Sequence, residues 1–268
     1  MTKQKPTLIE HFKDIQDPRL QRKQLHKLDD IFFMTLCAVI CGCDGWVAIE
    51  KFANIKRNWF EQYLSLENGV PSHDTFGRVF SLIDPEQFQT CFSTWIKDIV
   101  KSVTGDVIAV DGKCLRRSHD KSSNKSAIYM VSAWSHDNQL TLGQVKVDEK
   151  SNEITALPAL LENLDITGSI ITTDALNTQK KSAEVIVSKG ADYVTALKGN
   201  QSRLHDDVIL FFENTPTSYA NSLNTYKSVD ACHGRIEERI VTSCNQIEWL
   251  TAHYSHPHLA SIISVTSR

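Results

Sequence analysis

The sequence has none of the features that mark secreted, membrane-spanning or fibrous proteins. Its first residues, Met-Thr-Lys-Gln-Lys-Pro, contain no apolar core of a signal peptide. The longest apolar run, residues 31–43, is too short to cross a bilayer and predicts a buried helix instead. No internal repeat or low-complexity tract is present. We therefore expect a globular cytoplasmic protein without a membrane partner.

A disulfide framework and a strong net charge are also missing. The seven cysteines are an odd number and none pairs with histidines at zinc-site spacing, so we expect reduced thiols. The formal net charge of -3 does not indicate a nucleic-acid-binding protein, and such binding would have to depend on local basic clusters. At 268 residues the chain can form one large domain or two modest ones.

Residues 1–101 show helical periodicity and no strand pattern. Residues 1–27 are locally basic, and Asp17-Pro18-Arg19 within them predicts a turn or a helix start. From charge alone, a solvated arm is the favoured interpretation of this segment over a DNA-binding arm. Apolar residues then recur at helical spacing over residues 28–66, where we expect them to form a core.

The segment at residues 70–80 is a candidate DNA-binding helix. Ser72 is predicted to cap it, and its buried face would be Phe76, Val79 and Phe80. His73, Thr75 and Arg78 would then face solvent or a phosphate backbone. A short helix in this position is compatible with a helix-turn-helix, and equally with a helical packing module.

After residue 101 the pattern changes to strands and helices. Strands are predicted at residues 107–110, 128–134, 140–147, 170–173 and 193–197. Helices are predicted at residues 153–164 and 179–189, the second ended by Gly190. Three antiparallel strands ahead of βα units match the ribonuclease H layout, a mixed sheet covered by helices. The pattern is less clear from residue 202, where we expect a helix at 204–212, a polar loop, and strands at 233–241 and 259–265.

Two of the predicted strands end in an aspartate. Asp111 follows a continuous apolar run that is typical of a strand buried on both faces, and Asp174 follows a β-branched run. In the ribonuclease H layout these two strands are neighbours, so the two carboxylates would form an oxygen-rich pocket suited to Mg²⁺. The alternative is that each aspartate only caps the turn or helix after it.

Seven motifs follow one another along the chain: Asp17-Pro18-Arg19, residues 71–76, residues 108–113, residues 150–154, Thr173-Asp174-Ala175 with Gln179-Lys180, residues 198–201, and residues 233–237. In these motifs and their order the chain resembles the H-repeat-associated, ISAs-type insertion-sequence transposases of the DDE class along essentially its whole length.

The resemblance implies a helical, DNA-binding-like domain at residues 1–101 and an incomplete ribonuclease-H-like catalytic domain at residues 102–268. It implies a site for two Mg²⁺ or Mn²⁺ ions held by Asp111, Asp174 and a third acid. In similar transposases that acid is a glutamate beyond the fifth strand, in a segment that this sequence lacks, so we expect a chain shortened at its C-terminus. Glu237 is the local substitute, although an ion pair with its neighbouring arginines is the simpler interpretation.

The resemblance also implies double-stranded DNA at the element's ends as the partner, and allows a homodimer on that DNA. The candidate DNA contacts are Lys113, Arg116, Arg117, His73, Arg78 and Lys198. The leading interpretation is thus a transposase that cuts and transfers DNA strands, with activity weakened or lost for want of the third acid. The alternatives are a non-catalytic DNA-binding remnant and a phosphoesterase unrelated to transposition, which would leave the helical region without a role.

Overall fold

The computed structural model describes residues 7–100, 104–115, 118, 128–147, 153–232 and 235–268. The chain divides into two compact units, a helical unit (residues 1–100) and a sheet unit (residues 101–268), and each is described by itself. Among the described residues, no helix is long and apolar enough to cross a membrane. The six cysteines whose state is described are free thiols, as predicted.

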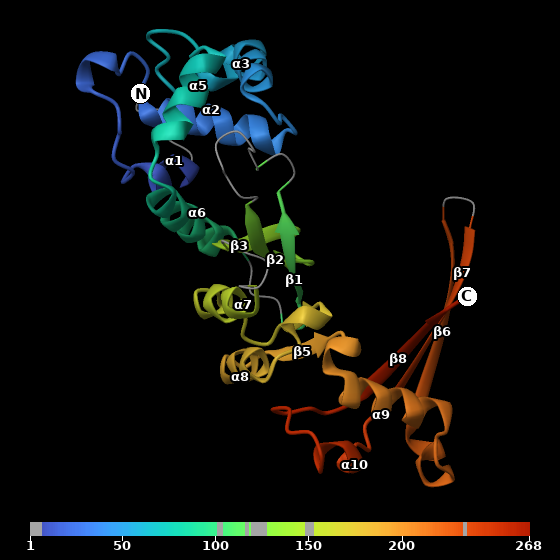
Figure 1. Cartoon of the computed structure of the whole chain (residues 1–268). Helices are drawn as coiled ribbons and strands as arrows, with labels where there is room; N and C mark the ends of the chain where they lie inside the picture. The colour runs from blue at the N-terminus through green and yellow to red at the C-terminus, as the bar shows by residue number, and fades with distance from the viewer. Residues whose placement is uncertain (1–6, 101–103, 116–117, 119–127, 148–152, 233–234) are drawn as a thin grey trace. The chain divides into compact units, whose positions relative to one another are not determined.

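The helical unit contains six α-helices and one short 3-10 turn in its described part (Figure 1). These are α1 (Thr7–Phe12), η1 (Gln21–Lys23), α2 (Leu28–Ile40), α3 (Trp46–Ile55), α4 (Arg57–Phe60), α5 (His73–Leu82) and α6 (Pro85–Ile99). Pro85 occupies the first turn of α6, and the Asp84 side chain caps that helix by accepting a hydrogen bond from the Glu86 amide at 2.9 Å.

Aromatic side chains fill the centre of the helical unit, as the periodicity predicts. Phe12, Phe32, Phe60 and Phe76 are each at most 2% exposed, and Phe32 meets Phe80 edge-on at 5.4 Å between ring centroids. Each such ring removes a large apolar area from water, so the core of this unit is held mainly by hydrophobic burial.

The candidate DNA-binding helix α5 differs from the prediction in two respects. Residues 61–72 separate it from α4, which is longer than the three or four residues of a helix-turn-helix connection. Ser72 makes no capping hydrogen bond, and Glu50 of α3 takes that role by accepting from the His73 amide at 2.9 Å. Of the predicted buried face, Phe76 and Val79 are fully buried and Phe80 is half-buried.

The first part of the sheet unit is a five-stranded mixed sheet of order β3-β2-β1-β4-β5. Its strands are β1 (Val107–Cys114), β2 (Tyr129–Ser135), β3 (Leu140–Val147), β4 (Ile170–Thr173) and β5 (Asp192–Thr195). β2 is antiparallel to both β1 and β3, whereas β1, β4 and β5 run parallel. Helix α7 (Glu153–Glu162) packs on β2 and β3, and α8 (Lys180–Ser188) packs on β5. The predicted combination of helices and a mixed sheet is confirmed.

The expectation that β1 is buried on both faces is wrong. Ile108 and Val110 are buried, but Val107 is 37% exposed and Ala109 is also exposed. The expectation that β1 ends at Asp111 is wrong as well, because pairing with β2 continues to Cys114. One face of this strand is therefore buried, and its other face is open among the described residues.

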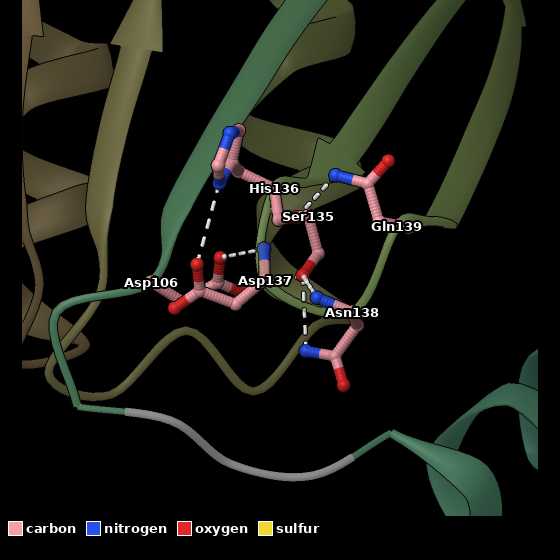
Figure 2. A network of polar contacts seen from close by, with 6 residues as sticks. All are labelled: Asp106, Ser135, His136, Asp137, Asn138 and Gln139. Atoms are coloured by element: carbon pink, nitrogen blue, oxygen red, sulfur yellow. Dashed lines mark hydrogen bonds and ion pairs between the residues drawn. The ribbon is translucent and has the colours of Figure 1, made fainter.

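A buried carboxylate closes the end of the sheet where β1 begins. Figure 2 shows Asp106 facing the turn between β2 and β3, where its Oδ2 accepts from Ser135 Oγ at 2.5 Å and its Oδ1 from the Asp137 amide at 3.0 Å. Ser135 Oγ in turn accepts from the Asn138 amide at 3.1 Å. Asp106 is only 4% exposed, so these bonds satisfy a charge that water does not reach.

Two glycines allow the parallel strands to start level with one another. Gly168 (φ +73°) precedes β4 and Gly190 (φ +72°) precedes β5, and the Gly168 amide donates to the Gly190 carbonyl at 2.8 Å. A side chain would strain the backbone at either position, which explains why Gly190 ends α8 as predicted.

The second part of the sheet unit is a separate three-stranded sheet, β6-β7-β8, beside helix α9 (Ser202–Glu213). Its strands are β6 (Leu223–Cys232), β7 (Arg235–Cys244) and β8 (Ile262–Ser267). The sequence predicts β7 and β8 but places β6 in a polar loop, and that prediction is wrong. β6 lacks the alternation of a half-buried strand because both its faces are largely exposed, with Tyr226 at 68% and Val229 at 65%.

Lys189 joins the two helices that cover the five-stranded sheet. Its Nζ donates to the carbonyls of Leu161, Glu162 and Leu164 at 2.7–2.8 Å, at the C-terminal end of α7. The Leu161 carbonyl also accepts from the Leu164 amide at 3.1 Å. A cation is favoured beside the carbonyls at the C-terminal end of a helix. Lys189, which follows α8, thus donates hydrogen bonds to the carbonyl groups at the end of α7.

We expect Lys189→Met to lower the free energy of unfolding by about 2 kcal/mol, because three carbonyls would lose a charged donor. Lys181→Met is the matched control, since Lys181 is exposed on α8 and makes no assigned hydrogen bond or ion pair among the described residues. Urea denaturation of both variants measures the difference. Equal midpoints for the two variants would contradict the proposed role of Lys189.

Candidate functional site

The register between β1 and β4 brings the two candidate acids together. The parallel pairing runs from Val107 opposite Ile170 to Val110 opposite Thr173. The next residue on each strand is the aspartate, Asp111 on one and Asp174 on the other. Since paired strands lie about 4.8 Å apart, the two acids are neighbours at one edge of this strand pair.

Both carboxylates lie on the open face of the sheet. Val110 and Thr173 are buried toward the helices, so the residues after them project to the opposite side. Asp174 continues the extended backbone of β4, with φ −73° and ψ 175°, and the alternation therefore holds there as well. Asp111 and Asp174 are both exposed, as groups that meet a ligand from solvent must be.

Asp174 also caps the turn that follows it. Its Oδ1 accepts from the Asn177 amide at 3.3 Å and from Asn177 Nδ2 at 3.1 Å, within the 3-10 turn η3 (Ala175–Asn177). The two interpretations that the sequence leaves open for this residue are therefore compatible. One carboxylate oxygen fastens the turn while the residue remains exposed.

A second segment supports the same turn from the end of β5. Asn200 Nδ2 donates to the Ala175 carbonyl at 2.7 Å, and Gln201 Nε2 donates to the Thr178 carbonyl. Thr178 Oγ1 in return donates to the Ala196 carbonyl at 2.6 Å. Residues 198–201 carry a family motif, but the sequence alone gives no sign that two of them brace the Asp174 turn.

Two of the candidate DNA-contacting lysines lie near the acids. Lys113 is on β1 two residues after Asp111, so it shares the open face, and Lys198 follows the end of β5 at the same edge of the sheet. Both are exposed. Arg116 and Arg117 lie outside the described residues.

Glu237 is placed on the other sheet. It lies on β7, where its Oε1 accepts from Arg239 Nη2 at 3.1 Å. Within the part of the chain that the structure describes, no group of three or more His, Cys, Asp or Glu side chains could together hold a metal ion. The structure thus brings Asp111 and Asp174 together and does not bring Glu237 to them.

The two candidates on α5 differ in their freedom to bind phosphate. His73 Nδ1 lies 2.7 Å from Glu50 Oε2. Glu50 accepts from both the backbone and the ring of His73, which lowers the pKa of its carboxyl. Arg78 is exposed, and no partner is assigned to it among the described residues.

The interpretation of residues 1–27 as a solvated arm is wrong for Arg19. Its guanidinium donates to both carboxylate oxygens of Asp17, from Nε at 2.9 Å and from Nη2 at 2.7 Å, and also to the His26 carbonyl at 2.9 Å. The Arg19 side chain is only 6% exposed. The Asp17-Pro18-Arg19 motif is therefore a partly buried bidentate ion pair that shapes the turn, and the Arg19 guanidinium is bonded within the fold.

Two family models match the chain in succession. Residues 9–96 match a model described as DDE_Tnp_1-associated, and residues 103–260 match one described as Transposase DDE domain.

Curated relatives match over nearly all of the chain. An uncharacterised protein in the dhlA 3′ region of Xanthobacter autotrophicus is 45% identical over 96% of this chain and 87% of its own length. Two H repeat-associated putative transposases of Escherichia coli strain K12, YhhI and YbfD, are 47% and 46% identical over 89% of this chain. The matched region spans 63% of YhhI and 94% of YbfD.

We expect Asp17→Asn to lower the free energy of unfolding of the helical unit by about 2–3 kcal/mol near neutral pH, because the largely buried Arg19 would lose its counter-ion. Burial raises the pKa of the Asp17 carboxyl, but hydrogen bonds from Arg19 and its charge outweigh that effect and hold the pKa below its ordinary value. The pair therefore stabilises the fold above the unfolded pKa and is lost as the pH falls through the lower folded pKa.

Denaturation between pH 2 and pH 7 tests this expectation, with the exposed Glu67→Gln as the control. The difference between wild type and Asp17→Asn should shrink toward the acid end of this range. A difference that is constant with pH would contradict the role of the ion pair.

Proposed function

The chain belongs to the family of transposases with a DDE domain, and from that membership we propose that it acts in transposition by binding an element's DNA ends and cutting and transferring DNA strands. The observation that carries this proposal is the β1–β4 register, which sets Asp111 and Asp174 side by side on an open face of the sheet. Two neighbouring carboxylates repel each other, so they would not stabilise a sheet whose role was purely structural.

The strand arrangement supports a ribonuclease-H-like catalytic domain. Three antiparallel strands are followed by two parallel strands joined through helices, in the order β3-β2-β1-β4-β5. In this arrangement the aspartates on β1 and after β4 are neighbours, as the proposed chemistry requires. The helical unit would then serve to hold DNA, with residues 1–100 as one domain and 101–268 as the other.

The residues at this site fit a hard divalent cation such as Mg²⁺ or Mn²⁺. Asp111 and Asp174 offer exposed carboxylate oxygens, and among the described residues no hydrogen bond is assigned to Oδ2 of Asp174. Mg²⁺ is usually held by one or two carboxylates together with water and substrate phosphates, so two acids meet its minimum requirement. When bound, such ions activate the attacking oxygen and stabilise the leaving oxygen of a phosphodiester.

The chain's own residues would place the DNA for this reaction. Lys113 and Lys198 lie near the acids and would neutralise the phosphates of the strand to be cut, which otherwise repel two aspartates. Asn200 and Gln201 hold the turn after Asp174 and so limit how far its carboxylate can move. Holding the reacting groups in place in this way lowers the barrier of a bimolecular step substantially.

A non-catalytic DNA-binding protein is the second candidate, because no third acid accompanies Asp111 and Asp174 in the described part of the chain. Glu237 is the acid that the sequence offers for that position. Its ion pair with Arg239 supports a structural role for it instead. The cleavage experiment below includes Glu237→Gln to separate these two roles.

We expect the wild-type chain to nick a DNA that carries the element's ends in the presence of Mn²⁺, and Asp111→Asn or Asp174→Asn to slow nicking at least about a hundredfold. Asp192→Asn is the matched control. Asp192 is an exposed acid at the start of β5, opposite Ile170, and it therefore lies at the other end of the strands from the two site acids. Glu237→Gln should nick like wild type. Binding of DNA without any nicking would favour the second candidate.

We expect DNA binding to weaken with salt, log affinity falling linearly with log salt concentration. Arg78→Ala and Lys198→Ala should each reduce the slope by about one, as the loss of one phosphate contact does. Arg57→Ala is the control, because Arg57 is an exposed helical arginine already paired with Glu61 at 2.8 Å. Retardation assays at several salt concentrations measure the slopes, and equal slopes for all three variants would contradict these contacts.

A further inference from the structure

One buried side chain holds Asp174 by a single oxygen. Asn177 is only 1% exposed, and its backbone amide and its Nδ2 both donate to Asp174 Oδ1, at 3.3 and 3.1 Å. Two donors on one oxygen fix the rotation of the carboxylate about its own axis. The same arrangement leaves Oδ2 without an assigned hydrogen bond among the described residues.

Burying the amide group of Asn177 carries a cost in stability. Its Oδ1 is buried, and no hydrogen-bond partner for it exists in the described structure. An unpaired buried acceptor costs about 1–3 kcal/mol, and a leucine, which has the same branched shape, would avoid that cost. The hydrogen bond from Nδ2 to Asp174 is therefore made at the cost of leaving the Oδ1 acceptor of the same side chain unpaired.

Resting on the proposed function, we infer that Asn177 is a positioning residue, which orients the Asp174 carboxylate so that Oδ2 faces a divalent cation. Asn177 would not touch the ion or the DNA, and it acts through Asp174. Partners of this kind behind a ligand typically change metal affinity 10–100-fold when they are removed, because they set the orientation of the ligand.

The surrounding turn makes this role possible. Asn200 and Gln201 hold the carbonyls of Ala175 and Thr178 on either side of Asn177. The turn that carries Asn177 is thereby fixed to the end of β5 as well as to β4. A donor on a rigid support can orient a carboxylate that is itself exposed to water.

Binding of Mn²⁺ to the full chain, followed by the electron paramagnetic resonance signal of the free ion, tests the inference. We expect Asn177→Leu to weaken Mn²⁺ binding about tenfold or more, while its free energy of unfolding without metal stays equal to that of wild type or rises. The matched control is Ser182→Ala, which removes another buried polar atom without a partner in the described structure. Ser182 makes no assigned contact with Asp174, so its variant should bind Mn²⁺ like wild type.

The outcomes separate this inference from the proposed function. If Asp111→Asn and Asp174→Asn weaken Mn²⁺ binding but Asn177→Leu does not, Asn177 only caps the turn and the inference is wrong. If Asp174→Asn binds Mn²⁺ like wild type, the metal site itself is wrong and the proposed function fails with it. If Asn177→Leu does not fold, Asn177→Ser, which keeps the backbone donor and loses Nδ2, decides the question by the same comparison with Ser182→Ala.

Discussion

The parallel pairing of β1 with β4 is the constraint on which the candidate site depends. It sets Val110 opposite Thr173 and therefore makes Asp111 and Asp174 neighbours. Because side chains alternate between faces along a strand, a slip of one residue would send one acid into the face covered by α7 and α8. The buried alternation of Ile108 and Val110 opposes such a slip, since it would expose both. The core of the sheet thus fixes the geometry of its open face.

The sequence predicted those parts of the fold whose signals are local. The β-branched runs before Asp111 and Asp174 identify β1 and β4, and Gly190 correctly marks the end of α8. The pairing of the two acids could also be predicted, because strands, helices and their order together favour one sheet layout. β6 could not be predicted in this way. Both of its faces are largely exposed to solvent, so its sequence does not alternate between apolar and polar residues.

Side-chain partners that are distant in the chain account for the remaining differences. Glu50 replaces Ser72 as the cap of α5, and Lys189 completes the end of α7 from beyond α8. Arg19 is basic in a basic segment, and only its bidentate bonds to Asp17 show that it is held within the fold. Asn177 and Gln201 are likewise polar residues in turns by sequence, and their roles depend on which atoms the folded chain brings to them.

The long connection between β1 and β4 affects when, during synthesis of the chain, the two acids can come together. Asp111 leaves the ribosome before β2, β3 and α7, while its partner strand β4 follows all three. Domains generally fold as units, N-terminal units first, and parallel strands pair late because the connecting chain must close first. A nascent chain would therefore complete its helical unit while the two acids are still apart. On the proposed function, DNA binding by the helical unit would thus become possible before strand cutting by the sheet unit.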